Sequence, residues 1–378
     1  MANFLDLLGK ADNSQEERPL MNNKSAMLGI VISFLVFTWL CAILRLWCRF
    51  FIVKAAGWDD FFVVILMISL SIGSIGTCVL TDYGLGEHLL QFPELHFDLP
   101  KYFQIFYLCN GTLPMSTCFI KIAILLQYLR AFEKGSKSRT LTIIVLVLTS
   151  LWGVAYIFLG WVPCLPVRAY WDWTLPVVGR WGFGAQVAEE LIRTYESHAM
   201  SNMILDCVIF ALPLPLYFNG ETHKNSRKSV LGLFLLGSVV LMLSAWRLAS
   251  LIHSRAGTYP TLDPTWYGPT PMVLAILEID VAAICACLPV FWPILKFSMG
   301  NIFVTHEVKV EVTTESAGFG RDSEDLELGR GGGTACSYYR QQSYSMPSPT
   351  KDTDALVQPE IFGAYMHGKT TCSVAKHG

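Results

Sequence analysis

Seven apolar runs constrain the fold of this chain more than any other feature of its sequence. They cover residues 26–46, 60–80, 102–129, 141–162, 197–218, 229–252 and 272–295, and each has about the 20 residues that an α-helix needs to cross a bilayer. Hydrophobic residues make up 53% of the chain and charged residues 15%, which is a low charged fraction for a globular protein. The sequence therefore predicts an all-α fold, a polytopic bundle of seven transmembrane helices in a lipid bilayer.

The charges between the runs orient this predicted bundle. Lysine and arginine accumulate in the cytosolic loops of membrane proteins. The first, third and fifth loops are the shorter ones and carry the denser set: Arg45, Arg49, Lys54, Arg130, Lys134, Lys137, Arg139, Lys224, Arg227 and Lys228. Seven helices place the two termini on opposite sides, so we expect the N-terminus outside and the C-terminus in the cytosol.

Composition divides the chain into three parts. Residues 1–25 form a polar extracellular N-terminus, residues 26–297 the seven-helix membrane domain, and residues 298–378 a cytosolic tail. The tail contains an acidic segment, a glycine run and a stretch rich in Ser, Tyr and Gln, and such a segment buries too little apolar surface to fold. We expect a disordered tail that is either phosphorylated and bound by a cytosolic signalling partner or simply solvated.

Two acids, Glu278 and Asp280, lie inside the seventh apolar run. Charge at membrane depth is kept only where it faces protein or water and has a partner. Arg247 lies at a similar depth in the sixth run, and the two acids are roughly 200° apart around a helix, so only one can face it. We expect Arg247 to pair with Glu278. The fifth run adds a polar stripe at four-residue spacing, which consists of His198, Asn202 and Asp206.

This predicted layer has two interpretations. Its residues line an outward-facing cavity that binds a ligand, or they form an ion-pair and hydrogen-bond network that only fixes helix packing.

A second ionic layer is predicted nearer the cytosol. Asp59 and Asp60 open the second run, and Lys121 lies in the inner third of the third run, so Lys121 can pair with either acid. Alternatively, the two acids stabilise the N-terminus of their helix, and Lys121 extends towards the lipid headgroups.

The outer loops hold two further candidates. Gly84 and Gly86 predict a sharp turn that aims His88 at the mouth of the bundle or at solvent. Cys164 in the fourth loop is a candidate partner of Cys109, although the sequence does not specify this pairing.

A set of short motifs along the chain resembles a known family. In order they are Gly57-Trp58-Asp59-Asp60, Gly84-Leu85-Gly86-Glu87-His88, Lys121 with Tyr128-Leu129-Arg130, Trp171-Asp172, Asp206 with Leu212-Pro213-Leu214-Pro215, Arg247, Asp263-Pro264-Thr265-Trp266, and Glu278 with Cys285-Ala286-Cys287-Leu288-Pro289. Over residues 28–295 the chain is similar to the fungal rhodopsin-like seven-helix family, also known as the satratoxin-cluster membrane protein family. The resemblance implies a receptor-like protein that accompanies a secondary-metabolite gene cluster.

The sequence argues against several classes of site. A retinal Schiff base needs a lysine well inside the seventh helix, and residues 272–295 contain none, while Lys296 lies at the cytosolic boundary. The eleven cysteines show no zinc spacing, so we expect no cofactor and no metal. The net charge of −2 argues against a nucleic-acid partner, since such proteins usually have a strongly basic face.

Two functions fit a multi-pass protein of the plasma membrane or an endomembrane. A receptor-like sensor would bind a small lipophilic ligand in the outer layer. A membrane-embedded biosynthetic enzyme would use Glu278, Asp280, Asp206 or His88 as an acid or a base. No nucleophile, metal set or phosphate loop accompanies the acids, which favours the non-catalytic function.

Overall fold

The computed structural model describes residues 12–13, 15–89, 95–214 and 224–300 of the 378-residue chain. Side chains are described within these ranges except in residues 95–98, 224–233 and 291–300. The described residues up to Lys296 belong to one compact unit, and Phe297 begins a second one. The predicted tail beyond residue 300, and residues 1–11 and 14 of the predicted N-terminal segment, lie outside the described residues.

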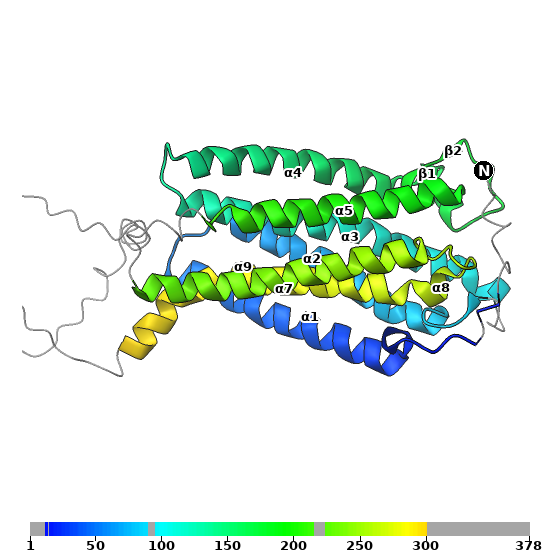
Figure 1. Ribbon diagram of the computed structural model, residues 1–378, viewed down its shortest axis with the longest axis horizontal. Coiled ribbons are helices and arrows are strands. Elements are labelled where there is room, and N and C mark those ends of the chain that lie inside the picture. Colours follow the sequence, from blue (N-terminus) through cyan, green and yellow to red (C-terminus); the bar gives the residue numbers. More distant parts are fainter. Residues whose placement is uncertain (1–11, 14, 90–94, 215–223, 301–378) are drawn as a thin grey trace, which may run out of the picture. The chain divides into compact units, whose positions relative to one another are not determined.

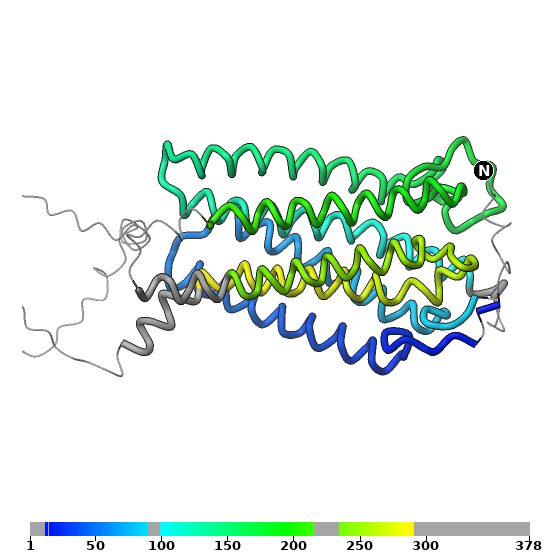
Figure 2. The backbone as a smooth tube through the Cα atoms, viewed as in Figure 1, coloured from blue at the N-terminus to red at the C-terminus, as the bar shows by residue number. Residues whose placement is uncertain are grey.

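Long α-helices make up nearly all of the first unit. They are α1 (Lys24–Trp47), α2 (Trp58–Leu80), α3 (Leu95–Ala131), α4 (Lys137–Trp161), α5 (Ala188–Ala211), α7 (Lys224–Ser254) and α9 (Pro269–Gly300), of which the residues up to Lys296 belong to this unit. Figures 1 and 2 show them lying lengthwise beside one another, with α2 packed on α1 and α3, α3 packed on α4, and α5 packed on α7. A π-helical segment, Cys48–Ile52, extends α1.

The two ends of this bundle are built differently. One end carries the short helix α8 (Pro264–Tyr267) and two antiparallel strands, β1 (Cys164–Leu165) and β2 (Gly179–Arg180). The connections from α1 to α2 and from α3 to α4 lie at the opposite end (Figure 1). We refer to these as the α8 end and the α1–α2 end. Single turns of 3-10 helix cover Leu20–Asn22, Thr81–Tyr83, Val167–Tyr170 and Gly182–Gly184.

Six helical segments in the described part of the chain are long and apolar enough to cross a membrane. They are Lys24–Ile52, Trp58–Tyr83, Leu99–Ala131, Lys137–Trp161, Phe234–Ser254 and Pro264–Val290. They coincide with six of the predicted runs, so the prediction of a mostly helical, multi-pass membrane domain is confirmed. Helix α5 differs from them because it carries many polar residues, including Glu189, Glu190, Arg193, Glu196, His198, Asn202 and Asp206.

The side chains that α4 exposes are largely apolar. Leu148, Leu151, Val154 and Phe158 recur at helical spacing, and each is exposed. An exposed apolar stripe of this length is unfavourable in water. We therefore assign this face of α4 to contact with lipid.

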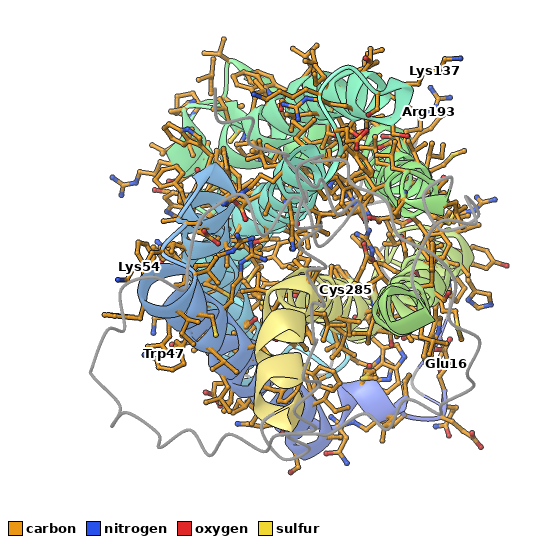
Figure 3. All side chains as sticks on the ribbon, turned by 90° about the vertical axis from the view of Figure 1, so that its left-hand side faces the viewer. Glu16, Trp47, Lys54, Lys137, Arg193 and Cys285 are labelled. Carbon is orange, nitrogen blue, oxygen red and sulfur yellow. The ribbon has the colours of Figure 1, made fainter. Side chains whose placement is uncertain are left out.

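Helix α9 is the most enclosed of the long helices. Every residue from 273 to 283 is buried, so the two acids on this helix face protein instead of lipid. In the end-on view of Figure 3, Cys285 of α9 lies towards the middle, whereas Lys54 and Lys137 point outward at the rim.

Small residues allow α3 and α4 to approach closely. A Cβ atom added at Gly153 of α4 would lie 2.0 Å from the sulfur atom and 2.8 Å from the Cβ atom of Cys118 in α3. Helix pairs in membranes use such small residues because their association depends on close packing. Gly29 of α1, by contrast, has no heavy atom within 4 Å of the position where a Cβ would be added.

These two glycines give a matched test of the packing. We expect Gly153→Val to lower the yield of monodisperse protein in detergent several-fold, because valine cannot occupy the space between α3 and α4. Gly29→Val makes the same chemical change where space is open, and should leave the yield close to that of the wild type. Size-exclusion chromatography of both variants measures this, and equal yields would contradict the described α3–α4 packing.

Candidate functional site

Five charged or amide side chains from four helices meet inside the bundle. Lys121 comes from α3, Asn202 and Asp206 from α5, Arg247 from α7 and Glu278 from α9. All are buried except Asp206, whose side chain is 13% exposed. We call this set the polar layer.

Arg247 and Glu278 form the ion pair that their depths predict. The Nε atom of Arg247 donates to Oε2 of Glu278 at 3.0 Å, and its Nη2 atom lies 3.4 Å from Oε1. Two donors on one carboxylate give the pair a defined orientation as well as charge neutralisation. This pair therefore fixes α7 against α9.

Asn202 links this pair to a second one. Its Nδ2 atom lies 2.6 Å from Oε1 of Glu278 and 3.0 Å from Oδ2 of Asp206. The other oxygen of Asp206, Oδ1, accepts a hydrogen bond from Lys121. The polar layer is therefore two ion pairs of zero net charge joined by one amide, and all four carboxylate oxygens are engaged.

The pairing of Lys121 differs from the prediction. The sequence suggested Asp59 or Asp60 as its partner, but Lys121 contacts Asp206 of α5. The depth of a residue follows from its position in a run, whereas the direction in which a helix turns its side chains depends on packing. Lys121 thus belongs to the polar layer and not to an inner layer with the two aspartates.

Asp280 lies on a different face of α9 from Glu278, as their separation around the helix predicts. It is fully buried, and no described residue donates a hydrogen bond to either of its carboxylate oxygens. Thr38 of α1 lies close enough to interact with it, but the Thr38 hydroxyl donates to the carbonyl of Phe34 at 2.9 Å. Asp280 is therefore separate from the polar layer.

His198 is enclosed by aromatic rings. Its ring stacks on Trp152 of α4 at a centroid distance of 5.4 Å and meets the edge of Tyr156 at 4.8 Å. Phe183 completes the enclosure at 6.0 Å. The predicted stripe on α5 therefore divides, because Asn202 and Asp206 join the polar layer while His198 packs against α4.

His88 lies in a cluster at the α8 end. Its Nδ1 atom is 2.9 Å from Oδ2 of Asp263, and its ring stacks on Trp266 with a centroid distance of 3.7 Å. Asp263 also accepts from the backbone N–H of Trp266, which caps α8. His88 has no contact with the five residues of the polar layer. Sequence analysis named Asp263 only as part of a motif and did not predict that it is the partner of His88.

A glycine turn brings these two segments together. Gly86 has a φ angle of +96° and donates its N–H to the carbonyl of Thr265 at 2.9 Å. An added Cβ at Gly86 would lie 2.7 Å from the carbonyl oxygen of Asn22, so only glycine fits. The Gly-Leu-Gly-Glu-His and Asp-Pro-Thr-Trp motifs therefore pack against each other and form one structural unit at the α8 end.

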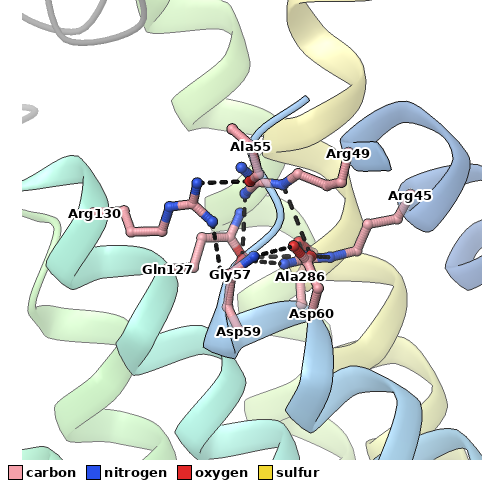
Figure 4. Close-up of polar contacts among 9 residues, drawn as sticks. All are labelled: Arg45, Arg49, Ala55, Gly57, Asp59, Asp60, Gln127, Arg130 and Ala286. Carbon is pink, nitrogen blue, oxygen red and sulfur yellow. Dashed lines mark hydrogen bonds and ion pairs between the residues drawn. The ribbon is translucent and has the colours of Figure 1, made fainter. Parts of the chain in front are cut away.

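Asp59 and Asp60 have arginine partners at the α1–α2 end (Figure 4). Arg45 donates to Asp59 at 2.6 Å and to Asp60 at 3.1 Å, and Arg130 of α3 donates to Asp59 at 2.8 Å. Arg49 reaches Asp59 at 3.3 Å. We call these three arginines and two aspartates the arginine cluster.

Arg45 lies inside the bundle, which differs from the prediction. Sequence analysis counted it as a loop charge, but its side chain is fully buried, and its Nη1 atom donates to the carbonyl of Ala286 in α9 at 2.5 Å. The signal for its role was present, because two acids at a membrane boundary need cationic partners. The alternative capping role holds as well for Asp60, whose Oδ2 accepts from the N–H of Gly57 at 3.1 Å.

Cys109 and Cys164 do not form a disulfide. Both are free, and the thiol of Cys109 donates to the carbonyl of Gly73 while that of Cys164 donates to the carbonyl of Pro166. Burial raises the pKa of the Cys164 thiol, and nearby Arg180 acts in the opposite direction.

Comparison with known proteins places the chain in a family. The model of the fungal rhodopsin domain matches residues 44–297, which include the polar layer and the arginine cluster. The chain belongs to the fungal rhodopsin domain family. This family assignment agrees with the resemblance that the sequence motifs indicate.

Two relatives of this family member come from named gene clusters. The "Polyenoic acids biosynthesis gene cluster protein Ba17b" of Metarhizium anisopliae is 22% identical over 279 residues, 70% of this chain and 71% of that protein. The "Satratoxin biosynthesis SC1 cluster protein 4" of Stachybotrys chartarum is 22% identical over 195 residues, 51% of this chain and 66% of that protein. No solved structure matches the chain.

The ion pair of the polar layer makes a specific prediction. Arg247→Ala and Glu278→Ala each leave one uncompensated buried charge, so each should lower stability by about 3–5 kcal/mol. The double alanine variant should lose less than the sum of the two, and the exchange of the two residues should recover part of the loss. Thermal unfolding of the purified variants in detergent measures these effects.

Asp280→Asn is the control for this experiment. It neutralises an acid on the same helix that has no cationic partner among the described residues, so it should cost far less than the single alanine variants. Strictly additive losses in the double variant would count against direct pairing.

Proposed function

We propose that this protein is a seven-helix, receptor-like membrane protein that binds a small lipophilic molecule at the polar layer. The observation that supports it best is that four helices meet at one neutral network whose hydrogen bonds can be exchanged for those of a ligand. A ligand that replaces one partner there changes how α3, α5, α7 and α9 pack on one another.

The proposal requires α5 to be the seventh membrane span. Its polar side chains His198 and Asn202 are buried, whereas Met200 and Ile204 are each 52% exposed and Val208 is also exposed. Between residues 198 and 208 these polar residues therefore face the bundle, and these apolar residues face outward at helical spacing. A helix with this pattern suits the membrane although its mean hydropathy is low.

We further propose that the α8 end lies outside and the arginine cluster lies in the cytosol. The cluster contains three arginines and two aspartates, so it leaves a surplus of positive charge at that end. The exposed side chains of Lys54 and Lys137 lie near the same end. Both observations support the positive-inside orientation.

The hydrogen bonding of the acids favours a sensor over an enzyme. A general base needs an oxygen atom within reach of the proton that it removes. Both oxygens of Glu278 and both oxygens of Asp206 are bound by Arg247, Asn202 and Lys121. These carboxylates are therefore arranged to hold helices together until a ligand competes for their partners.

The relatives suggest the process in which the protein works. Both carry names that refer to biosynthetic gene clusters, for polyenoic acids and for satratoxin. We infer that this chain serves a secondary-metabolite pathway and responds to a lipophilic product or intermediate that reaches it through the bilayer. Signalling through the tail to a cytosolic partner is part of the proposal and concerns residues outside the described ones.

A membrane-embedded enzyme is the second candidate, and Asp280 is the observation that favours it. Its carboxyl group is fully buried, and neither oxygen is hydrogen-bonded by a described residue, which leaves it available as an acid or a base. In that case a substrate would have to reach the α1–α9 interface.

Complementation of a gene-deletion strain separates the two functions. For a sensor, deletion of the gene should lower transcription of a whole pathway. The variants Glu278→Gln and Asp206→Asn should reach the membrane but fail to restore this transcription, since each removes a charge and keeps the size of the side chain. Asp280→Asn should restore the transcription. RNA abundance and metabolite profiles of these strains give the readout.

The opposite pattern identifies the enzyme. If one precursor accumulates in the deletion strain and Asp280→Asn fails to complement the deletion, the protein is an enzyme and not a sensor. Full restoration by both polar-layer variants would return those residues to a purely structural role.

A further inference from the structure

A small cavity lies between α2, α3 and α9. Its volume is about 40 Å³, and none of the five polar-layer residues lines it. Helix α9 contributes apolar side chains, including Ala275 and Ile276. The hydroxyl groups that line it come from α2 and α3 and belong to Ser69, Ser74, Thr77, Thr112 and Ser116.

Most of these hydroxyl groups use their hydrogen atom within the protein. Ser69 donates to the carbonyl of Thr112 at 3.1 Å, Ser116 donates to Oγ of Ser69 at 2.9 Å, and Thr77 donates to the carbonyl of Gly73 at 2.9 Å. Their oxygen atoms keep lone pairs that can accept a further hydrogen bond. The cavity wall therefore offers several acceptors.

Ser74 is the exception. Its side chain is fully buried, and no described residue forms a hydrogen bond with its Oγ atom. A serine inside a helix usually donates to the carbonyl four residues earlier, as Ser71 does to Met67 at 2.7 Å. A buried hydroxyl without a partner costs free energy, so the orientation of Ser74 indicates a partner in the cavity that it lines.

Size and charge identify that partner. No charged side chain lines the cavity, so an ion would enter it without a counter-charge, which is strongly unfavourable. A volume of about 40 Å³ gives room for about one to three water molecules. We propose that this cavity is a water-binding site in which Oγ of Ser74 is hydrogen-bonded to water that also contacts the hydroxyl groups of α3. This inference does not depend on the proposed ligand-binding function.

A double-mutant cycle tests the site in the full-length protein in detergent. Ala275→Val adds two methyl groups to the cavity wall, which displaces the water and leaves Ser74 without a partner. It should therefore lower the thermal midpoint at least about 2 °C more in the wild type than in the Ser74→Ala background. Ala282→Val is the matched control, because it adds the same groups to α9 at a residue outside the cavity lining, and its effect should be equal in both backgrounds.

A dry cavity gives a different result. Ser74→Ala would then raise the thermal midpoint by removing an unpaired hydroxyl, and Ala275→Val would have the same effect in both backgrounds. Either outcome overturns the proposal. If the variants do not fold, a density map of the wild type that shows waters decides the matter, since density within hydrogen-bond distance of Ser74 Oγ is expected and a cavity without it contradicts the site.

Discussion

The free-energy cost of a charge in apolar surroundings determines much of this structure. An ion removed from water must find a counter-charge and hydrogen bonds. The chain meets this requirement at two depths: the arginine cluster joins α1, α2, α3 and α9, and the polar layer joins α3, α5, α7 and α9. Because α3 and α9 take part in both, the two sets fix the rotation of these helices at two levels.

The two sets differ in how readily they can change. In the arginine cluster, Arg45 is bound by two acids and a backbone carbonyl. Loss of any one of these partners therefore leaves Arg45 bound by the other two. In the polar layer, one amide, Asn202, connects two otherwise separate ion pairs. Replacement of that one connection would let α5 move relative to α9 while each ion pair stays intact, which is why we place the ligand response there.

The sequence predicted what depends on depth along a helix. The pair of Arg247 and Glu278 followed from equal depth and from the 3.6-residue period, which also separates Asp280 from it. The pairing of Lys121 with Asp206 did not follow, because it depends on how α3 and α5 are rotated by packing. Arg45 was missed because it was counted with the cations of the first loop. The contact of His88 with Asp263 joins segments 175 residues apart, and no local pattern specifies such a contact.

The central claim is that the two ion pairs act as one network through Asn202, and a triple-mutant cycle tests it most directly. The coupling free energy between Asp206→Asn and Glu278→Gln would be measured by thermal unfolding with Asn202 present and with Asn202→Leu. The account predicts a coupling of about 0.5–3 kcal/mol in the wild-type background and a clearly smaller one once Asn202 is replaced, since only the direct electrostatic interaction of the two carboxylates then remains. Additive effects with Asn202 present, or a coupling that is unchanged without it, would contradict the account.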